Sequence, residues 1–352
     1  MEFHMKKILI DAFVPYIGDI FDGVARTEVI QPEDFTPEAV ADADALIVRT
    51  RTRCDAPLLE GSAVTFVGTA TIGTDHFNLP WLASRGIEAV NAPGCNAPAV
   101  AQYVLASIYA LVPEPEGLTV GVVGVGHVGR IVARWCEALG MNVLCCDPPR
   151  AEAEGPAGFV ALDEIARRAD IITFHTPHTK APAPYPSHHL ADEAFFASLQ
   201  RTPLIINAAR GPVVDNAALL RAMDAKRVSG CVIDCWEGEP AVSPELLARA
   251  DIATPHIAGY SRQGKMRATQ AVVNALLRHL GSEKVMDLGA PAPDAPAPSK
   301  EAVTASYNPF DDMAAMRAAA LPADSAGGYP VLPPEVFERL RNHYSLREEV
   351  GA

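Results

Sequence analysis

The sequence predicts an α/β protein with two doubly wound, parallel-sheet domains and a small C-terminal segment that contains helices. Three features support this fold class. Short apolar stretches alternate with helix-like stretches twice along the chain, a glycine-rich turn follows the apolar stretch at residues 118–123, and a run rich in proline and alanine occupies residues 289–299. Alternating strands and helices are typical of parallel sheets whose faces are covered by helices.

The first domain begins with a short apolar strand and continues with alternating helices and strands. Ligands of such sheets bind beyond the carboxyl ends of the strands, so the polar residues that follow each strand are the candidates for function. Taken singly, each of them is better explained as an ordinary turn residue. We expect strands at residues 7–11, 44–49, 65–69 and 87–91, and helices at residues 38–43 and 81–85.

A nucleotide-binding turn is predicted where the first strand of the second domain meets a helix. The valines of residues 120–123 are typical of a buried parallel strand, and three glycines follow at the spacing G-x-G-x-x-G. The first glycine permits a tight turn, the second lets the backbone approach a pyrophosphate, and the third lets the helix pack closely on the strand. This pattern favours a Rossmann-like domain. The turn residues expected to contact the cofactor are Gly124, Gly126, His127, Val128 and Gly129.

An acidic residue indicates which dinucleotide binds. Asp147 ends the next predicted strand, at residues 142–146, and lies 18 residues after the last glycine of the turn. A carboxylate there can accept hydrogen bonds from the adenosine ribose and would repel a 2'-phosphate, which favours NAD over NADP. Arg150 is the one residue that favours NADP, because an arginine can accept a 2'-phosphate.

The rest of the second domain continues the alternation of strands and helices. A long apolar helix at residues 97–111 leads into it, and a helix at residues 267–279 is expected to return the chain to the first domain. We expect further helices at residues 163–169, 195–199 and 216–225, and strands at residues 171–175, 203–207, 231–234 and 252–254. Beyond the proline-rich run, helices are expected at residues 311–320 and 334–343.

Composition limits the classes of partner. The chain of 352 residues is long enough for two or three domains, and its net charge of -14 argues against a nucleic-acid partner. No apolar run is long enough for a membrane helix, and we expect no signal peptide before the first strand. Seven cysteines, an odd number without paired metal spacing, are expected to be reduced in a cytoplasmic protein.

Four histidines in the loop at residues 175–189 could suggest zinc. No helical pair of histidines and no carboxylate frames them in the spacing of a metal site, so we expect no metal there. A loop beside the cofactor explains them more simply.

Three charged residues after successive strands fit one reaction. Arg210 can hold a carboxylate with its two-pronged guanidinium, as a 2-hydroxy or 2-oxo acid requires. His256 can take the hydroxyl proton while a hydride leaves carbon 2. Glu239, hydrogen-bonded to the other ring nitrogen, would orient the ring and stabilise its protonated form.

The chain resembles the D-2-hydroxyacid dehydrogenase family. The similarity rests on residues 66–76 (FVGTATIGTDH), 92–96 (APGCN), 146–150 (CDPPR), 236–240 (WEGEP) and 256–260 (HIAGY), and it covers residues 5–285 well. It implies that Arg210, Glu239 and His256 are the catalytic residues of that family. It also implies a homodimer, formed through a tail segment that residues 334–349 resemble only weakly.

The resemblance also implies contacts position by position. Thr50, Thr71 and Tyr260 are expected to touch the substrate. Gln102 is a departure, because the family usually has glutamate there. Contacts with NAD are implied for Asp147, Thr176, Ala208, Ala209, Arg210, Asp234 and Gly259.

The substrate implied by the resemblance is a small phosphorylated 2-hydroxy acid, whose second anion needs a cation from the first domain. Arg49, Arg51 and Arg53 follow a strand at two-residue spacing and would point to one side if the extended geometry continued. Arg49 is the candidate for substrate binding. If Arg49 only shapes the domain, Arg339 and Arg341 of a partner's tail become the candidates.

The domain boundaries follow from these elements. We expect a substrate domain at residues 5–97 with 260–288, an NAD domain at 98–259, a linker at 289–299 and a dimerisation segment at 300–352. Two alternatives stay open. One is a dehydrogenase of another 2-hydroxy acid, such as 3-phosphoglycerate, and the other is a non-enzymatic NAD-sensing scaffold with the same fold.

Overall fold

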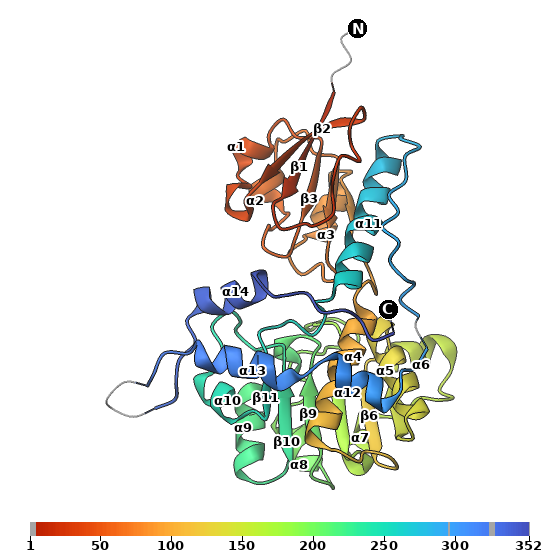
Figure 1. Cartoon of the computed structure of the whole chain (residues 1–352), viewed down its shortest axis with the longest axis vertical. Helices are drawn as coiled ribbons and strands as arrows, with labels where there is room; N and C mark the ends of the chain where they lie inside the picture. Colours follow the sequence, from red (N-terminus) through yellow and green to blue (C-terminus); the bar gives the residue numbers. More distant parts are fainter. Residues whose placement is uncertain (1–4, 295, 324–327, 352) are drawn as a thin grey trace. The chain divides into compact units, whose positions relative to one another are not determined.

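The computed structural model describes residues 5–294, 296–323 and 328–351. The chain forms two compact units, each with its own parallel sheet (Figure 1). Unit 1 is Met1–Asn96 with Ser261–Pro293, and unit 2 is Ala97–Tyr260 with Asp294–Ala352. The predicted class, two doubly wound α/β domains, is confirmed.

Unit 1 contains a five-stranded parallel sheet in the order β2-β1-β3-β4-β5. Its strands are β1 (Lys6–Asp11), β2 (Ala25–Ile30), β3 (Ala45–Val48), β4 (Phe66–Thr69) and β5 (Glu88–Val90). Its helices are α1 (Pro37–Val40), α2 (Ala56–Leu59), α3 (Leu79–Ser84) and α11 (Arg262–His279), with a 3-10 turn at Pro32–Asp34. Strand β2 lies at the sheet edge and exposes most of its side chains, which is why its sequence gave no apolar signal.

Helix α11 covers one face of this sheet. Val272 and Leu276 are fully buried in a cluster with Ile8 of β1 and Phe66 of β4. A Cβ atom on Gly68 would lie 2.4 Å from Cγ1 of Val272, so only glycine lets the helix approach β4 this closely. The helix begins five residues before the predicted start at residue 267, because Ser261 caps it by accepting a hydrogen bond from the Gly264 amide at 2.9 Å.

Unit 2 contains a six-stranded parallel sheet in the order β11-β10-β9-β8-β6-β7. The chain order reverses between β6 and β8, and a doubly wound sheet binds its ligand at such a reversal. The strands are β6 (Thr119–Val123), β7 (Asn142–Cys146), β8 (Ile171–Phe174), β9 (Leu204–Asn207), β10 (Gly230–Ile233) and β11 (Ile252–Ala253).

The helices of unit 2 agree with the predicted pattern and add short ones. Three were not predicted, α6, α10 and α12, each of six or seven residues. Before the proline-rich run come α4 (Ala97–Leu111), α5 (His127–Ala138), α6 (Pro148–Glu154), α7 (Leu162–Arg168), α8 (Glu193–Ser198), α9 (Asn216–Asp224) and α10 (Pro244–Arg249), with a 3-10 turn at Gly211–Val213. After it come α12 (Lys300–Ser306), α13 (Pro309–Ala318) and α14 (Pro334–Asn342).

The C-terminal segment, residues 294–351 of the described chain, packs on unit 2. Helix α12 lies along α4 and α13 lies along β11 (Figure 1). Val303 is buried in the cluster that contains α4, and Met316 and Phe337 are buried in the cluster on the other side of the sheet. The segment is therefore part of the core of unit 2.

Three boundaries differ from the expected domains. Ala97 was expected to end the first domain but begins unit 2. Tyr260 was expected in the first domain but belongs to unit 2, where its ring lies 6.0 Å from that of Tyr344. The proline-rich run is divided between the units at residues 293 and 294. In the described part of the chain, no helix combines the length and apolar character needed to cross a membrane.

Candidate active site

The glycine turn after β6 has the geometry of a phosphate-binding loop. Gly124 has a φ of 87°, in the left-handed region that glycine tolerates. A Cβ on Gly129 would lie 2.0 Å from the Gly124 carbonyl oxygen, so α5 could not start here with any larger residue. A Cβ on Gly126 would meet nothing within 4 Å, which leaves open space beside the first turn of α5. His127 and Val128 form that turn, and its amides suit a pyrophosphate.

Asp147 lies at the carboxyl end of β7, as expected. Its carboxylate accepts hydrogen bonds from the Val125 amide at 2.7 Å and from the Arg150 amide at 3.1 Å. The Arg150 guanidinium is engaged with Glu154 at 2.8 and 2.7 Å and with the Val125 carbonyl at 2.6 Å. Arg150 is therefore less available to a 2'-phosphate, and this geometry agrees with a preference for NAD.

Thr176 lies beside the glycine turn and has a hydroxyl group without a hydrogen-bond partner among the described residues. Its Oγ1 is buried, and its backbone amide nitrogen lies 2.7 Å from where a Gly124 Cβ would be. Neighbouring His175 hydrogen-bonds through Nε2 to the Thr173 hydroxyl at 2.9 Å, and burial lowers its pKa to about 3. The uncharged His175 ring and the buried Thr176 hydroxyl therefore suit the sugar and phosphates of a dinucleotide, which need hydrogen-bond donors and no nearby negative charge.

His256 and Glu239 form a hydrogen-bonded pair. Nδ1 of His256 lies 2.6 Å from Oε1 of Glu239, and both side chains are three-quarters buried. Burial alone would raise the pKa of Glu239, but the His256 ring, Arg341 and the Trp236 amide together lower it to about 2. The carboxylate therefore stays ionised, orients the ring through Nδ1, and leaves Nε2 for chemistry.

Asp234 holds the loop that carries His256. Its Oδ1 accepts hydrogen bonds from the Thr254 hydroxyl at 2.7 Å and the Ile257 amide at 2.8 Å, and its Oδ2 accepts one from the Ala258 amide at 3.0 Å. Burial raises its pKa in spite of these bonds. Asp234, expected to contact NAD, is only 1% exposed and binds the loop with both oxygens.

Arg210 lies in the turn after β9, and hydrogen bonds within the turn hold it. The Asn207 side chain donates to the Arg210 carbonyl at 3.1 Å, and Nη1 of Arg210 donates to the Ala209 carbonyl at 2.8 Å. Burial raises the pKa of the nearby Cys235 thiol well above its usual value; Glu239 adds to this rise, and Arg210 opposes it. The three predicted catalytic residues thus lie on neighbouring turns after β9, β10 and β11, with Ala208 and Gly259 on the same turns.

The residues expected to bind substrate are distributed over both units. Thr50 is exposed and Thr71 hydrogen-bonds through Oγ1 to the Thr69 hydroxyl at 2.7 Å, both in unit 1. Tyr260 is in unit 2 and half-buried. As the sequence predicted, each residue comes after the end of a strand: Thr50 after β3, Thr71 after β4 and Tyr260 after β11.

The expected alignment of three arginines is wrong. Strand β3 ends at Val48, and the Thr52 amide donates to the Arg49 carbonyl at 3.2 Å, which closes a turn in place of an extended chain. Arg49 is 7% exposed and its Nε lies 3.6 Å from Oδ2 of Asp11, whereas Arg51 and Arg53 are exposed. A buried Arg49 that faces Asp11 is better suited to stabilising unit 1 than to binding an anion.

The histidine-rich loop has its own network. Nε2 of His189 lies 2.5 Å from Oε1 of Glu237, and its ring stacks on His188 with centroids 4.1 Å apart. Nε2 of His178 lies 3.1 Å from Nδ1 of His188. Across the residues that the structure describes, no group of three histidine, cysteine or carboxylate side chains is arranged to hold a metal ion.

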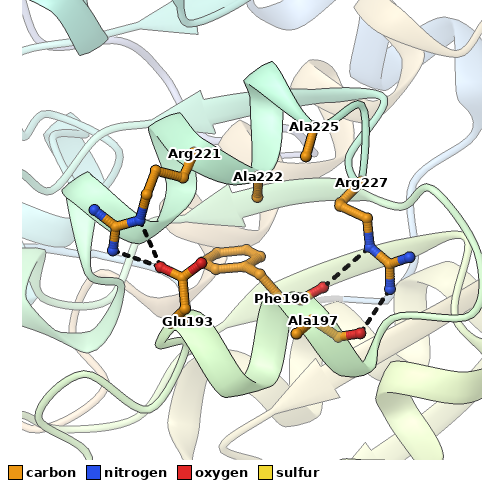
Figure 2. Close-up of a pocket in the computed structure, with 7 residues that line it drawn as sticks. All are labelled: Glu193, Phe196, Ala197, Arg221, Ala222, Ala225 and Arg227. Carbon is orange, nitrogen blue, oxygen red and sulfur yellow. Dashed lines mark hydrogen bonds and ion pairs between the residues drawn. The ribbon is translucent and has the colours of Figure 1, made fainter.

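A hollow of about 320 Å³ between α8 and α9 contains none of the predicted site residues. Figure 2 shows that its two cations are occupied: Arg221 pairs with Glu193, and Arg227 donates to backbone carbonyls of α8. The hollow therefore offers no free charge to a ligand.

Sequence reasoning missed one residue of the candidate active site and expected another in a different place. Arg347 contacts the loop that carries His256, and its only sequence signal is a cation near the chain end. Arg341 was considered only as part of a partner's tail, yet in this structure it lies beside Glu239 and Tyr260 of its own chain.

Comparison with known proteins agrees with the geometry. The family model "D-isomer specific 2-hydroxyacid dehydrogenase, NAD binding domain" matches residues 102–258. Erythronate-4-phosphate dehydrogenase of Bacteroides thetaiotaomicron is 43% identical and covers 98% of both chains, and that of Escherichia coli (strain ATCC 8739) is 42% identical and covers 97% of this chain and 92% of the relative.

A solved structure agrees in fold. The apo form of D-mandelate dehydrogenase from Rhodotorula graminis is 25% identical, covers 84% of this chain and all of that chain, and has a TM-score of 0.67. This structure and the relatives that match nearly the full length agree on the family. The chain belongs to the D-isomer-specific 2-hydroxyacid dehydrogenase family and is an NAD-dependent oxidoreductase.

Proposed function

We propose that this protein oxidises 4-phospho-D-erythronate to 2-oxo-3-hydroxy-4-phosphobutanoate, in the biosynthesis of pyridoxine. The observation that carries the proposal is the 2.6 Å pair of His256 and Glu239 beside the Arg210 turn, in a chain that matches erythronate-4-phosphate dehydrogenases over nearly its whole length.

The chemistry follows from the three side chains. Arg210 holds the substrate carboxylate with its guanidinium fork, which fixes carbon 2. Nε2 of His256 takes the proton of the 2-hydroxyl group as the carbon–oxygen double bond forms. Glu239 stabilises the protonated ring and keeps Nδ1 directed away from the substrate. Bound NAD supplies the acceptor for the hydride that leaves carbon 2.

We also propose the remaining contacts. Thr50, Thr71 and Tyr260 would bind the substrate, and the Gly124–Gly129 turn with Asp147, Thr176 and Gly259 would bind NAD. The open space at Gly126 and the unpartnered hydroxyl of Thr176 support the second assignment.

The homodimer is proposed on different grounds. Leu321 and Val331 pair as an antiparallel bridge in the C-terminal segment and are 58% and 48% exposed. Adjoining apolar side chains at the surface are typical of an interface. A cytoplasmic location is supported by seven free cysteines, six of them buried.

A substrate comparison tests the proposal. We expect the purified chain to reduce NAD with 4-phospho-D-erythronate at a kcat/KM at least ~100-fold above the values for 3-phosphoglycerate and unphosphorylated D-erythronate. A preference for 3-phosphoglycerate would favour a different dehydrogenase. Tight NAD binding without turnover of any 2-hydroxy acid would favour a sensing scaffold.

A further inference from the structure

The C-terminal segment reaches the catalytic loop of its own chain. Arg347, which follows α14, donates from Nη1 to the Ile257 carbonyl at 3.1 Å and from Nη2 to the Ala258 carbonyl. Nη2 also donates to the Ala99 carbonyl of α4 at 3.1 Å. One guanidinium therefore ties the loop at residues 256–260 to a buried helix.

Arg347 is itself fixed in place. Its guanidinium lies over the Tyr307 ring, 4.6 Å from the centroid, and Nη1 donates to the Tyr344 hydroxyl at 3.3 Å. The adjoining Glu348 carbonyl accepts a hydrogen bond from Nε2 of Gln102 at 3.1 Å. Gln102 of α4 thus anchors the chain next to Arg347.

The loop is held from two sides at the same residues. The Asp234 carboxylate accepts hydrogen bonds from the backbone amides of Ile257 and Ala258, and the Arg347 guanidinium donates hydrogen bonds to the carbonyls of the same two residues. His256, directly before them, has a φ of 56°, a conformation that non-glycine residues rarely adopt. Such a backbone persists only where its surroundings hold it.

A second arginine of the segment reaches the other end of the loop. Arg341 hydrogen-bonds to Tyr260 and lies near Glu239, and its side chain is only 16% exposed. Its Nη1 is 3.6 Å from a Glu338 oxygen. The segment therefore touches the surroundings of both members of the His256–Glu239 pair.

We propose that Arg347 is a positioning residue for the catalytic histidine, so that the C-terminal segment completes the catalytic centre within each chain, in addition to any role in dimerisation. The inference rests on the proposed role of His256 as the base. It is independent of which 2-hydroxy acid is the substrate. Displacing a base by about 1 Å can cost roughly 100-fold in rate, which sets the scale of the expected effect.

Arg347→Ala and Arg347→Lys test the proposal in the full-length protein with NAD bound. We expect both to lower kcat with 4-phospho-D-erythronate roughly 10- to 100-fold, with an unchanged Kd for NAD. Lysine should fail because a single ammonium cannot span three carbonyls. Guanidinium ion at low, non-denaturing concentration should restore part of the rate to the alanine variant. Arg317→Ala is the matched control. Arg317 lies in the same C-terminal segment and donates to the backbone carbonyls of Leu247, Ala248 and Ala250, which precede β11, so its removal should leave kcat at the wild-type value.

A measurement without turnover separates this inference from the proposed function. The proton in the short His256–Glu239 hydrogen bond should give a downfield NMR signal, identified by its loss in His256→Ala. We expect the signal to shift or broaden in Arg347→Ala and to return with guanidinium, even if the wild type oxidised no tested acid. An unchanged signal with wild-type kcat would overturn the proposal. Parallel loss of NAD binding and turnover, unrestored by guanidinium, would also overturn it, because Arg347 would then support unit 2 as a whole.

Discussion

Replacing Glu239 by glutamine removes the charge of the proposed catalytic pair, His256 and Glu239, and keeps an oxygen that can accept a hydrogen bond from Nδ1. The pKa of Glu239 is lowered from 4.5 to about 2 although burial opposes the change, so the protein favours the anion by a net ~3 kcal/mol, at about 1.4 kcal/mol per tenfold change in proton affinity. Attraction to the His256 ring and the hydrogen bond from it are the largest of the effects that lower this pKa, ahead of Arg341 and the Trp236 amide.

The same attraction stabilises the protonated ring. In Glu239→Gln the protonated ring loses its anionic partner, so oxidation, which needs the unprotonated ring, should switch on at lower pH than in the wild type. The plateau rate should fall because the base is weaker. The assay is the pH dependence of kcat/KM, followed by NADH absorbance from pH 5 to pH 9.

Glu237→Gln is the matched control for this change. Glu237 lies in the same turn but pairs with His189, with Nε2 and Oε1 2.5 Å apart. Its removal should leave the midpoint of the pH profile in place. A midpoint that stays unchanged in Glu239→Gln, or that moves equally in both variants, would refute the electrostatic pairing of Glu239 with His256.

Three further changes test other parts of the account. Asp147→Ala should raise the Kd for NAD about 10- to 100-fold and bring it closer to the Kd for NADP in equilibrium binding. An unchanged ratio of the two Kd values would contradict the ribose contact. Arg210→Lys keeps the charge but loses the fork, so kcat/KM should fall roughly 100-fold or more, whereas a wild-type value would exclude carboxylate binding by this residue. Leu321→Asp combined with Val331→Asp should give monomers in light scattering without lowering the unfolding temperature, and a stable dimer would place the interface elsewhere.

The dimer interface has to be tested with point substitutions, because the C-terminal segment cannot be removed without disturbing unit 2. Ending the chain near residue 290 would remove Met316 and Phe337 from the core of unit 2 and expose the surfaces that they cover. A truncated protein would therefore report on folding as much as on assembly.

The buried parallel strands were predictable because their sequences are short apolar runs bounded by turns. Strands β6, β9 and β10 fall within a residue of their expected positions. Strand β2 was missed because an edge strand exposes its side chains and loses the apolar pattern. Helices α2 and α10 were missed because four to six residues are too few to show a helical period.

The contact between His256 and Glu239 was predictable because both residues follow neighbouring strands and the proposed chemistry requires a base with an orienting carboxylate. Arg347 was not predictable in this way. Its acceptors are backbone carbonyls at Ala99, Ile257 and Ala258, about 90 to 250 residues away along the chain, and a backbone carbonyl has no sequence signature. The wrong alignment of Arg49 with Arg51 and Arg53 has a similar cause, because a turn closed by one backbone hydrogen bond replaced the expected extended chain.

Transfer of a labelled hydrogen tests the central claim most directly. 4-Phospho-D-erythronate carrying deuterium at carbon 2 should pass that deuterium to the nicotinamide, so that the NADH formed by the wild-type protein is monodeuterated and His256→Ala forms none while still binding NAD. Deuterium released into water, or full turnover by His256→Ala, would contradict direct hydride transfer with His256 as the base.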